Sequence, residues 1–113
     1  MNLAAAEVSM TTDQFTVLLA ERVMHWRATP DRFLTGGRGW SPRWKFQPTR
    51  RFADAIRLIE AAIPEEYTIV AGTKGQFVVR LQIGGITAQG FDKSKPLAIC
   101  RAVAAAYGIE VNL

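Results

Sequence analysis

The sequence is poor in the residues from which catalytic and metal sites are built. Its 113 residues include one cysteine, Cys100, and one histidine, His25. A single cysteine can form neither an intrachain disulfide nor a zinc cluster, so we expect a reducing compartment, the cytoplasm. Cys100 falls on an apolar helix face, where thiols are usually inert, and we interpret His25 as a surface or satisfied histidine and not as a catalytic base. We therefore expect no enzymatic activity, no metal and no cofactor.

Long apolar runs are also absent. The longest uninterrupted stretches are only a few residues, whereas a membrane-spanning helix needs roughly 18. Residues 1–10 lack the basic start and long apolar centre of a signal peptide. We expect no membrane contact, a flexible leader over residues 1–10, and one domain over residues 11–113.

The sequence does contain a local excess of positive charge. Residues 27–57 hold eight basic and two acidic side chains, a net charge of +6, whereas the rest of the chain carries −2. Ten of the fourteen basic residues are arginine. The planar guanidinium of arginine suits phosphate, although a GC-rich coding sequence produces the same bias. The segment favours an anionic partner.

Apolar periodicity predicts two helices in the first half of the chain. Thr11 begins a capping-box motif, and an apolar stripe follows over about residues 13–26. Thr49 is expected to cap a second helix that ends before Pro64. Asp54 is placed on the outer, solvated face of that helix.

Residues 28–48 interrupt the helical pattern. Three prolines and three glycines predict an irregular segment with room for a short strand or two. Trp44 and Phe46 would fit an alternating strand with both rings in the core and Arg43 in water, and we favour this interpretation. The alternative is that Trp44 stacks on a base between basic side chains.

Residues 67–91 change to the two-residue period of strands. Residues 67–71 and 76–83 read as strands, and Gly84-Gly85 predicts a two-residue hairpin into a third. The expected register makes one sheet face apolar and the other polar. The polar face is either exposed to solvent or a binding site, and it is lined by Arg80, Gln82, Thr87 and Gln89.

A third helix is predicted between Ser94 and Gly108. Arg101 lies at the margin of its apolar face and therefore needs a partner. The candidate carboxylates are Asp54, Glu60 and Asp92. A structural ion pair and an anion site both remain open for Arg101. Together the elements predict an α+β fold, in which three helices pack on an antiparallel sheet of three or four strands.

Three segments resemble the small phage proteins called phage ABA sandwich domain proteins. They are Glu21–Trp26 (ERVMHW), Phe46–Ala55 (FQPTRRFADA) and Leu97–Ala102 (LAICRA). The second motif of the family reads more like F-x-P-S-T-D-x-A-D-A, so Arg50 and Arg51 make this chain more basic there. The resemblance implies the α+β fold of that family, in which the motifs are mostly helix caps and core positions.

The third segment is also similar to phage anti-defence proteins of the Thoeris-inhibiting kind, which sequester nucleotide-derived immune signals without cleaving them. That similarity implies that Arg101 reaches a phosphate, with Arg50 or Arg51 as its partner and an aromatic residue against the base. The ligand-binding residues expected on these grounds, together with the polar sheet face, are Arg101, Arg50, Arg51, Trp44, Arg80 and Gln89.

The expected function is therefore that of a non-enzymatic phage accessory protein. It would bind and sequester a small phosphorylated, cyclic nucleotide in the host cytoplasm and so counter an antiviral defence. A domain of this size does not easily enclose a nucleotide, so a homo-oligomer with a pocket between protomers is a natural alternative. The alternative function is a nucleic-acid-binding or structural phage interaction protein that uses residues 27–57.

Overall fold

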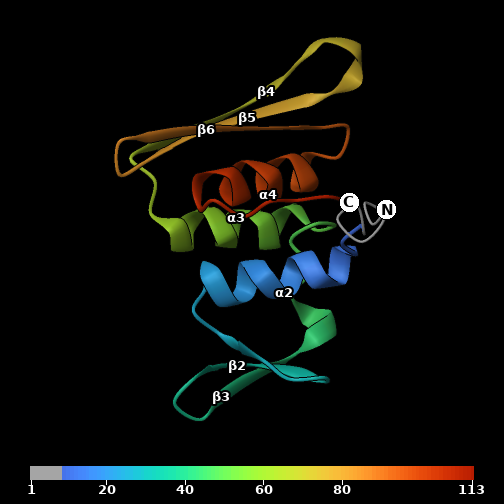
Figure 1. Cartoon of the computed structure of the whole chain (residues 1–113), viewed down its shortest axis with the longest axis vertical. Coiled ribbons are helices and arrows are strands. Elements are labelled where there is room, and N and C mark those ends of the chain that lie inside the picture. Colours follow the sequence, from blue (N-terminus) through green and yellow to red (C-terminus); the bar gives the residue numbers. More distant parts are fainter. Residues whose placement is uncertain (1–8) are drawn as a thin grey trace, which may run out of the picture.

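Three helices lie between two small antiparallel sheets in the computed structural model, which describes residues 9–113 (Figure 1). The elements are α2 (Thr12–Arg22), β1 (Arg27–Ala28), β2 (Arg32–Gly36), β3 (Gly39–Pro42), the 3₁₀ helix η1 (Arg43–Lys45), α3 (Phe52–Ala62), β4 (Glu66–Ala71), the 3₁₀ helix η2 (Thr73–Gly75), β5 (Phe77–Ile83), β6 (Ile86–Asp92) and α4 (Lys95–Ala106). The predicted α+β class and the order of its elements are confirmed. Residues 1–8 of the expected leader lie outside the described residues.

Helix α2 begins as predicted and ends earlier. The Thr11 hydroxyl accepts a hydrogen bond from the Gln14 N–H, and the Gln14 side chain accepts one from the Thr11 N–H, which completes the capping box. The expected end near residue 26 is wrong, because the helix stops at Arg22 and His25 turns the chain with a left-handed φ of 61°. Trp26 therefore lies outside the helix, and its ring packs against Phe33 and Phe46.

The irregular segment forms a sheet of its own. Strands β1, β2 and β3 pair as an antiparallel meander, with a turn at Gly36-Gly37 where both residues have positive φ. Its inner face contributes Phe33, whose ring contacts those of Trp26 and Phe46 with centroids 5.7 and 6.0 Å apart. This aromatic cluster is the core of the small sheet.

Helix α3 begins later than predicted and ends before Pro64, as predicted. Arg51, rather than Thr49, occupies the N-cap position, and it makes no side-chain cap. At the other end Ile63 precedes Pro64, a position that disfavours the helical conformation. Ile63 accordingly adopts a left-handed φ of 50° and its side chain is exposed.

The second sheet has the predicted hairpin and register. Ile83 pairs with Ile86 across Gly84-Gly85, and further along the strands Arg80 pairs with Gln89. Because side chains alternate between faces, the buried residues Val79 and Leu81 point to the opposite face from Arg80. The predicted separation into an apolar and a polar face is confirmed.

Helix α4 packs against strand β6 at Gly90. The predicted caps are present: the Ser94 hydroxyl accepts from the Leu97 N–H, and Gly108 follows the last turn with φ 71°. A Cβ added at Gly90 would overlap the Ala98 carbonyl oxygen and the Ala102 backbone nitrogen. Only glycine lets the helix and strand approach this closely.

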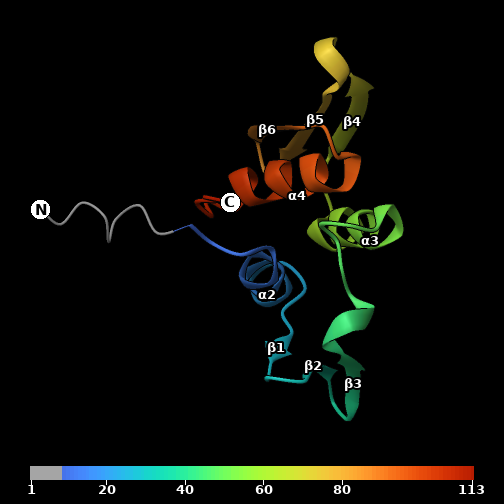
Figure 2. The same ribbon diagram turned by 90° about the vertical axis from the view of Figure 1, so that its right-hand side faces the viewer.

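The helices form the middle of the molecule. Figure 2 shows β4–β6, α4, α3, α2 and β1–β3 following one another along the long axis. Helix α4 therefore has a sheet on one side and helices on the other, and Ala98, Ile99, Cys100 and Val103 are fully buried. The largest buried side chains of the core are Phe15, Phe33, Phe46, Leu19, Leu58, Ile59, Leu81 and Ile99.

Replacing Gly90 by alanine should destabilise the protein by about 2 kcal/mol or more, because a methyl group has no space between β6 and α4. The free energy of unfolding from urea denaturation measures the effect. The neighbouring Gln89→Ala on the exposed face is the control and should change stability by less than about 0.5 kcal/mol. Equal stability of the two variants would contradict the close packing.

Candidate functional site

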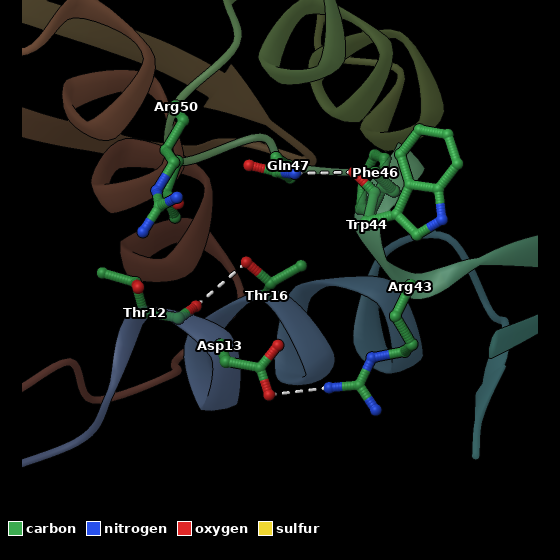
Figure 3. A pocket seen from close by; sticks show the side chains of 9 residues that line it. Thr12, Asp13, Thr16, Arg43, Trp44, Phe46, Gln47 and Arg50 are labelled. Carbon is green, nitrogen blue, oxygen red and sulfur yellow. Dashed lines mark hydrogen bonds and ion pairs between the residues drawn. The ribbon is translucent and has the colours of Figure 1, made fainter. Parts of the chain in front are cut away.

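A pocket of about 310 Å³ opens between the first turn of α2 and residues 43–50 (Figure 3). Its volume lies at the small end of the roughly 300–1,000 Å³ that is usual for small-molecule sites. Its lining is mixed, with cations, hydroxyls and an amide around one exposed indole. The lining residues are Thr12, Asp13, Thr16, Arg43, Trp44, Phe46, Gln47, Thr49 and Arg50.

The pocket wall is held by a buried carboxylate. Asp54 accepts a hydrogen bond from the Gln47 N–H at 2.9 Å and lies 3.8 Å from Arg57. This bond ties the loop before α3 to the first turn of the helix, while Phe46 is fully buried. The expectation that Asp54 lies on a solvated outer face is wrong, since its side chain has turned inward to satisfy the loop.

Arg43 joins the two sides of the pocket. Its Nη2 donates to Asp13 Oδ2 at 2.8 Å, and its Nη1 donates to the Thr29 carbonyl at 2.7 Å. Its guanidinium carbon lies 5.2 Å from the centre of the Phe33 ring. The Nε atom is buried without a hydrogen-bond partner among the described residues. Arg43 thus neutralises Asp13 and fixes one end of the pocket.

Trp44 and Arg50 are the exposed side chains at the pocket. The Trp44 residue is 62% exposed, although its backbone carbonyl accepts from Gln47 Nε2 at 2.6 Å. Arg50 lies across the pocket and its guanidinium points toward the start of α2 (Figure 3). Within residues 9–113 no carboxylate lies within 4.0 Å of it. Trp44 and the unneutralised cation of Arg50 therefore line one cavity, on opposite sides of the view in Figure 3.

The favoured interpretation of Trp44 and Phe46 as neighbours in a strand is wrong for Trp44. Residues 43–45 form a 3₁₀ helix, whose three-residue turn points Trp44 outward and Phe46 inward. Arg43, expected in water, is largely buried. The structure thus leaves Trp44 available in the way the base-stacking alternative requires.

Sequence reasoning missed the contribution of α2 to the pocket. Thr12, Asp13 and Thr16 lie on its first two turns, about thirty residues before the segment they face. The capping box located these turns, but no local signal pairs them with Arg43. The Arg43–Asp13 contact is a tertiary one.

The other expected ligand residues are distributed over the molecule. Arg80 and Gln89 are exposed on the outer face of β4–β6, where Arg80 lines a second cavity of about 260 Å³. Helices α3 and α4 lie between that sheet and α2 (Figures 1 and 2). Arg51 is exposed at the N-cap of α3 and does not line the pocket. Trp44 and Arg50 line the same pocket, and the other expected ligand residues lie elsewhere.

Arg101 forms a structural ion pair with Asp92, which is one of the two alternatives that the sequence left open. Its Nε donates to Asp92 Oδ2 at 3.2 Å, and the same carboxylate accepts from the Ser94 N–H at 2.9 Å. The ion pair links the end of β6 to α4. Arg101 is part of this link and not of the pocket lined by Trp44 and Arg50.

Groups suited to covalent chemistry lie away from the pocket. Burial raises the pKa of the Cys100 thiol far above its usual range, which keeps the thiol protonated. His25 is exposed in the turn after α2. Within residues 9–113 no three His, Cys, Asp or Glu side chains gather to hold a metal ion, and no helix there is long and apolar enough to cross a membrane.

The three helices and two antiparallel sheets define a small α+β domain. The family model of the phage ABA sandwich domain matches residues 17–104. The chain belongs to this family, as the resemblance of its three motifs implied.

A solved structure has the same fold. The chain is similar to a phage protein from Bacillus cereus ATCC 14579, with a TM-score of 0.75 and 18% sequence identity, covering 93% of this chain and 94% of that one. No curated protein matches the sequence. Because the similarity covers 93% of this chain, most of the described architecture belongs to the shared fold.

Replacing Asp54 by alanine should destabilise the protein by about 1–3 kcal/mol, because the part-buried Gln47 N–H loses its acceptor. Thermal and urea unfolding measure the loss. Glu60→Ala, an exposed acidic residue on the same helix, is the matched control and should have a small effect. If both variants were equally stable, the Asp54 contact would not hold the pocket wall.

The Cys100 thiol should resist alkylation in the folded protein at about pH 8, because burial keeps it protonated and inaccessible. Iodoacetamide labelling followed by mass spectrometry is expected to modify it only after denaturation. Rapid labelling of the native protein at one site would show that α4 is not packed as described.

Proposed function

We propose that this phage protein binds a small phosphorylated nucleotide in the pocket between α2 and residues 43–50 and releases it unaltered. The observation that carries the proposal is the placement of the exposed Trp44 indole and the Arg50 guanidinium in one cavity. The indole offers a stacking surface to a base, and the guanidinium offers a planar pair of donors to a phosphate.

The charge of the pocket favours an anion. Its three charged side chains are Asp13, Arg43 and Arg50, which together carry one positive charge. The Arg43–Asp13 pair at 2.8 Å cancels most of its own field, so Arg50 remains as the dominant charge. The Gln47 amide, held by the Trp44 carbonyl, adds an oriented polar group for base or sugar recognition.

The size of the cavity supports a small ligand. A volume of about 310 Å³ suits one base with its sugar and phosphate, whereas a long polynucleotide would extend beyond the walls. One stacking ring and one dominant cation also match one base and one phosphate group. A mononucleotide, linear or cyclic, is therefore the ligand class we propose.

Binding without reaction agrees with the side chains available. General acid–base catalysis needs a titratable group positioned at the substrate. The carboxylate at the pocket, Asp13, already accepts from Arg43, and the other charged groups are guanidiniums, which have donor atoms and no acceptor. We propose sequestration, with removal of a nucleotide signal of antiviral defence from the host cytoplasm as its purpose. This purpose follows the similarity to Thoeris-inhibiting proteins.

Substitution of Arg50 by glutamine or of Trp44 by alanine should weaken nucleotide binding about tenfold or more, because each removes a contact worth roughly 1.5–3 kcal/mol. Isothermal titration with linear and cyclic mononucleotides measures the dissociation constants. Arg38→Gln and Trp40→Ala, the same residue types on the β1–β3 sheet, are the matched controls and should bind like the unsubstituted protein.

Two outcomes would contradict the proposal. One is that only long oligonucleotides bind, with affinity falling steeply as salt rises. The other is that nucleotide recovered after heating the complex is chemically changed, which would indicate an enzyme. Recovery of the intact ligand is the expected result.

A further inference from the structure

The sheet of β1–β3 has an exposed outer face that the proposed pocket does not use. The register places Arg27, Leu34 and Trp40 in one row across its three strands. Phe33, the neighbour of Leu34 along β2, points to the other face and is fully buried. The row therefore faces away from the aromatic cluster, at the end of the molecule farthest from β4–β6 (Figure 1).

Trp40 is held as a platform on this face. The Arg32 guanidinium carbon lies 4.3 Å from the centre of the Trp40 ring, while 54% of the residue remains exposed. Arg32 is in turn fixed by Asp31, whose carboxylate accepts from both Nε and Nη2. These bonds lower the pKa of Asp31, so the pair stays ionised at neutral pH. The indole is thus oriented before any partner arrives, which reduces the entropy lost on binding.

The charge around Trp40 is positive and unneutralised. Arg27 is the β1 member of the row, and Arg38 is exposed at the turn between β2 and β3. Within residues 9–113 no carboxylate lies within 4.0 Å of either guanidinium. Asp31, the acidic residue of this sheet region, is engaged by Arg32. Such a field attracts a polyanion.

We propose that the outer face of the β1–β3 sheet is a binding surface for single-stranded nucleic acid. A base stacks on the free side of Trp40, and Arg27 and Arg38 contact flanking phosphates. With strands about 4.8 Å apart, the row across the sheet is only about 10 Å wide, enough for one or two bases. In a duplex the bases are stacked inside and cannot reach the indole, so a single strand is the form that fits.

Fluorescence anisotropy tests this surface with the full chain and a labelled oligothymidine of roughly twelve nucleotides, within the usual range of single-strand site sizes. Trp40→Ala should weaken binding about tenfold or more, because it removes the stacking surface. Arg27→Gln and Arg38→Gln should each lower the slope of log affinity against log salt by about one unit or less, since each removes one phosphate contact.

Matched controls separate this surface from the pocket. Trp44→Ala and Arg50→Gln should leave oligothymidine binding unchanged, even if they abolish mononucleotide binding. Lys93→Gln removes a positive charge next to α4, outside the β1–β3 sheet, and should also have no effect. If Trp40→Ala does not fold, as judged by circular dichroism, the two arginine variants decide the question.

Three results would overturn the inference. They are an absence of oligothymidine binding, equal affinity for the matching duplex, and loss of binding on substitution of Trp44 with none on substitution of the β1–β3 residues. Failure of mononucleotides to bind would overturn the pocket proposal and leave this one standing, because the two surfaces share no residue.

Discussion

The contact on which both candidate surfaces depend is the packing of Trp26, Phe33 and Phe46. Trp26 and Phe46 meet edge to face with centroids 5.0 Å apart, and Phe33 closes the cluster. Arg57 of α3 lies over both Trp26 and Phe46, at 5.7 and 5.6 Å. Three rings from three separate segments thus join the small sheet to the helices. Short hairpins are only marginally stable by themselves. The β1–β3 sheet, which carries Trp40, and the pocket wall at Arg43 therefore depend on this aromatic cluster.

Much of the fold could be predicted because its signals are local. The capping box at Thr11, the Gly84-Gly85 turn and the Ser94 cap each specify backbone geometry within a few residues, and all three are present. The end of α2 could not be predicted, because His25 adopts a left-handed conformation that usually marks glycine or asparagine. The β1–β3 sheet was expected only as a short strand or two within an irregular segment, for a related reason. Its strands are two to five residues long and carry no alternating pattern.

The candidate site was predictable only in part, because it is assembled by tertiary contacts. Of the six expected ligand residues, Trp44 and Arg50 line the same cavity, although a core position had been favoured for Trp44. Nothing local indicated that Asp13 would meet Arg43, or that Asp54 would turn inward to hold the loop. For Arg101, by contrast, the local sequence was informative but left an ion pair and an anion site open. Its marginal position on α4 indicated a partner, and a carboxylate nine residues earlier supplies it.

The most direct test of the central claim is a proton–nitrogen NMR titration with a mononucleotide, monitored at the three tryptophan indole N–H signals. Each tryptophan reports a different place: Trp26 the aromatic cluster, Trp40 the outer sheet face and Trp44 the pocket. Our account predicts that the Trp44 signal shifts and saturates with one ligand per site, while the Trp26 and Trp40 signals stay in place. A titration that shifts Trp40 alone, or that leaves all three signals unmoved, would contradict the proposal that the pocket binds a nucleotide.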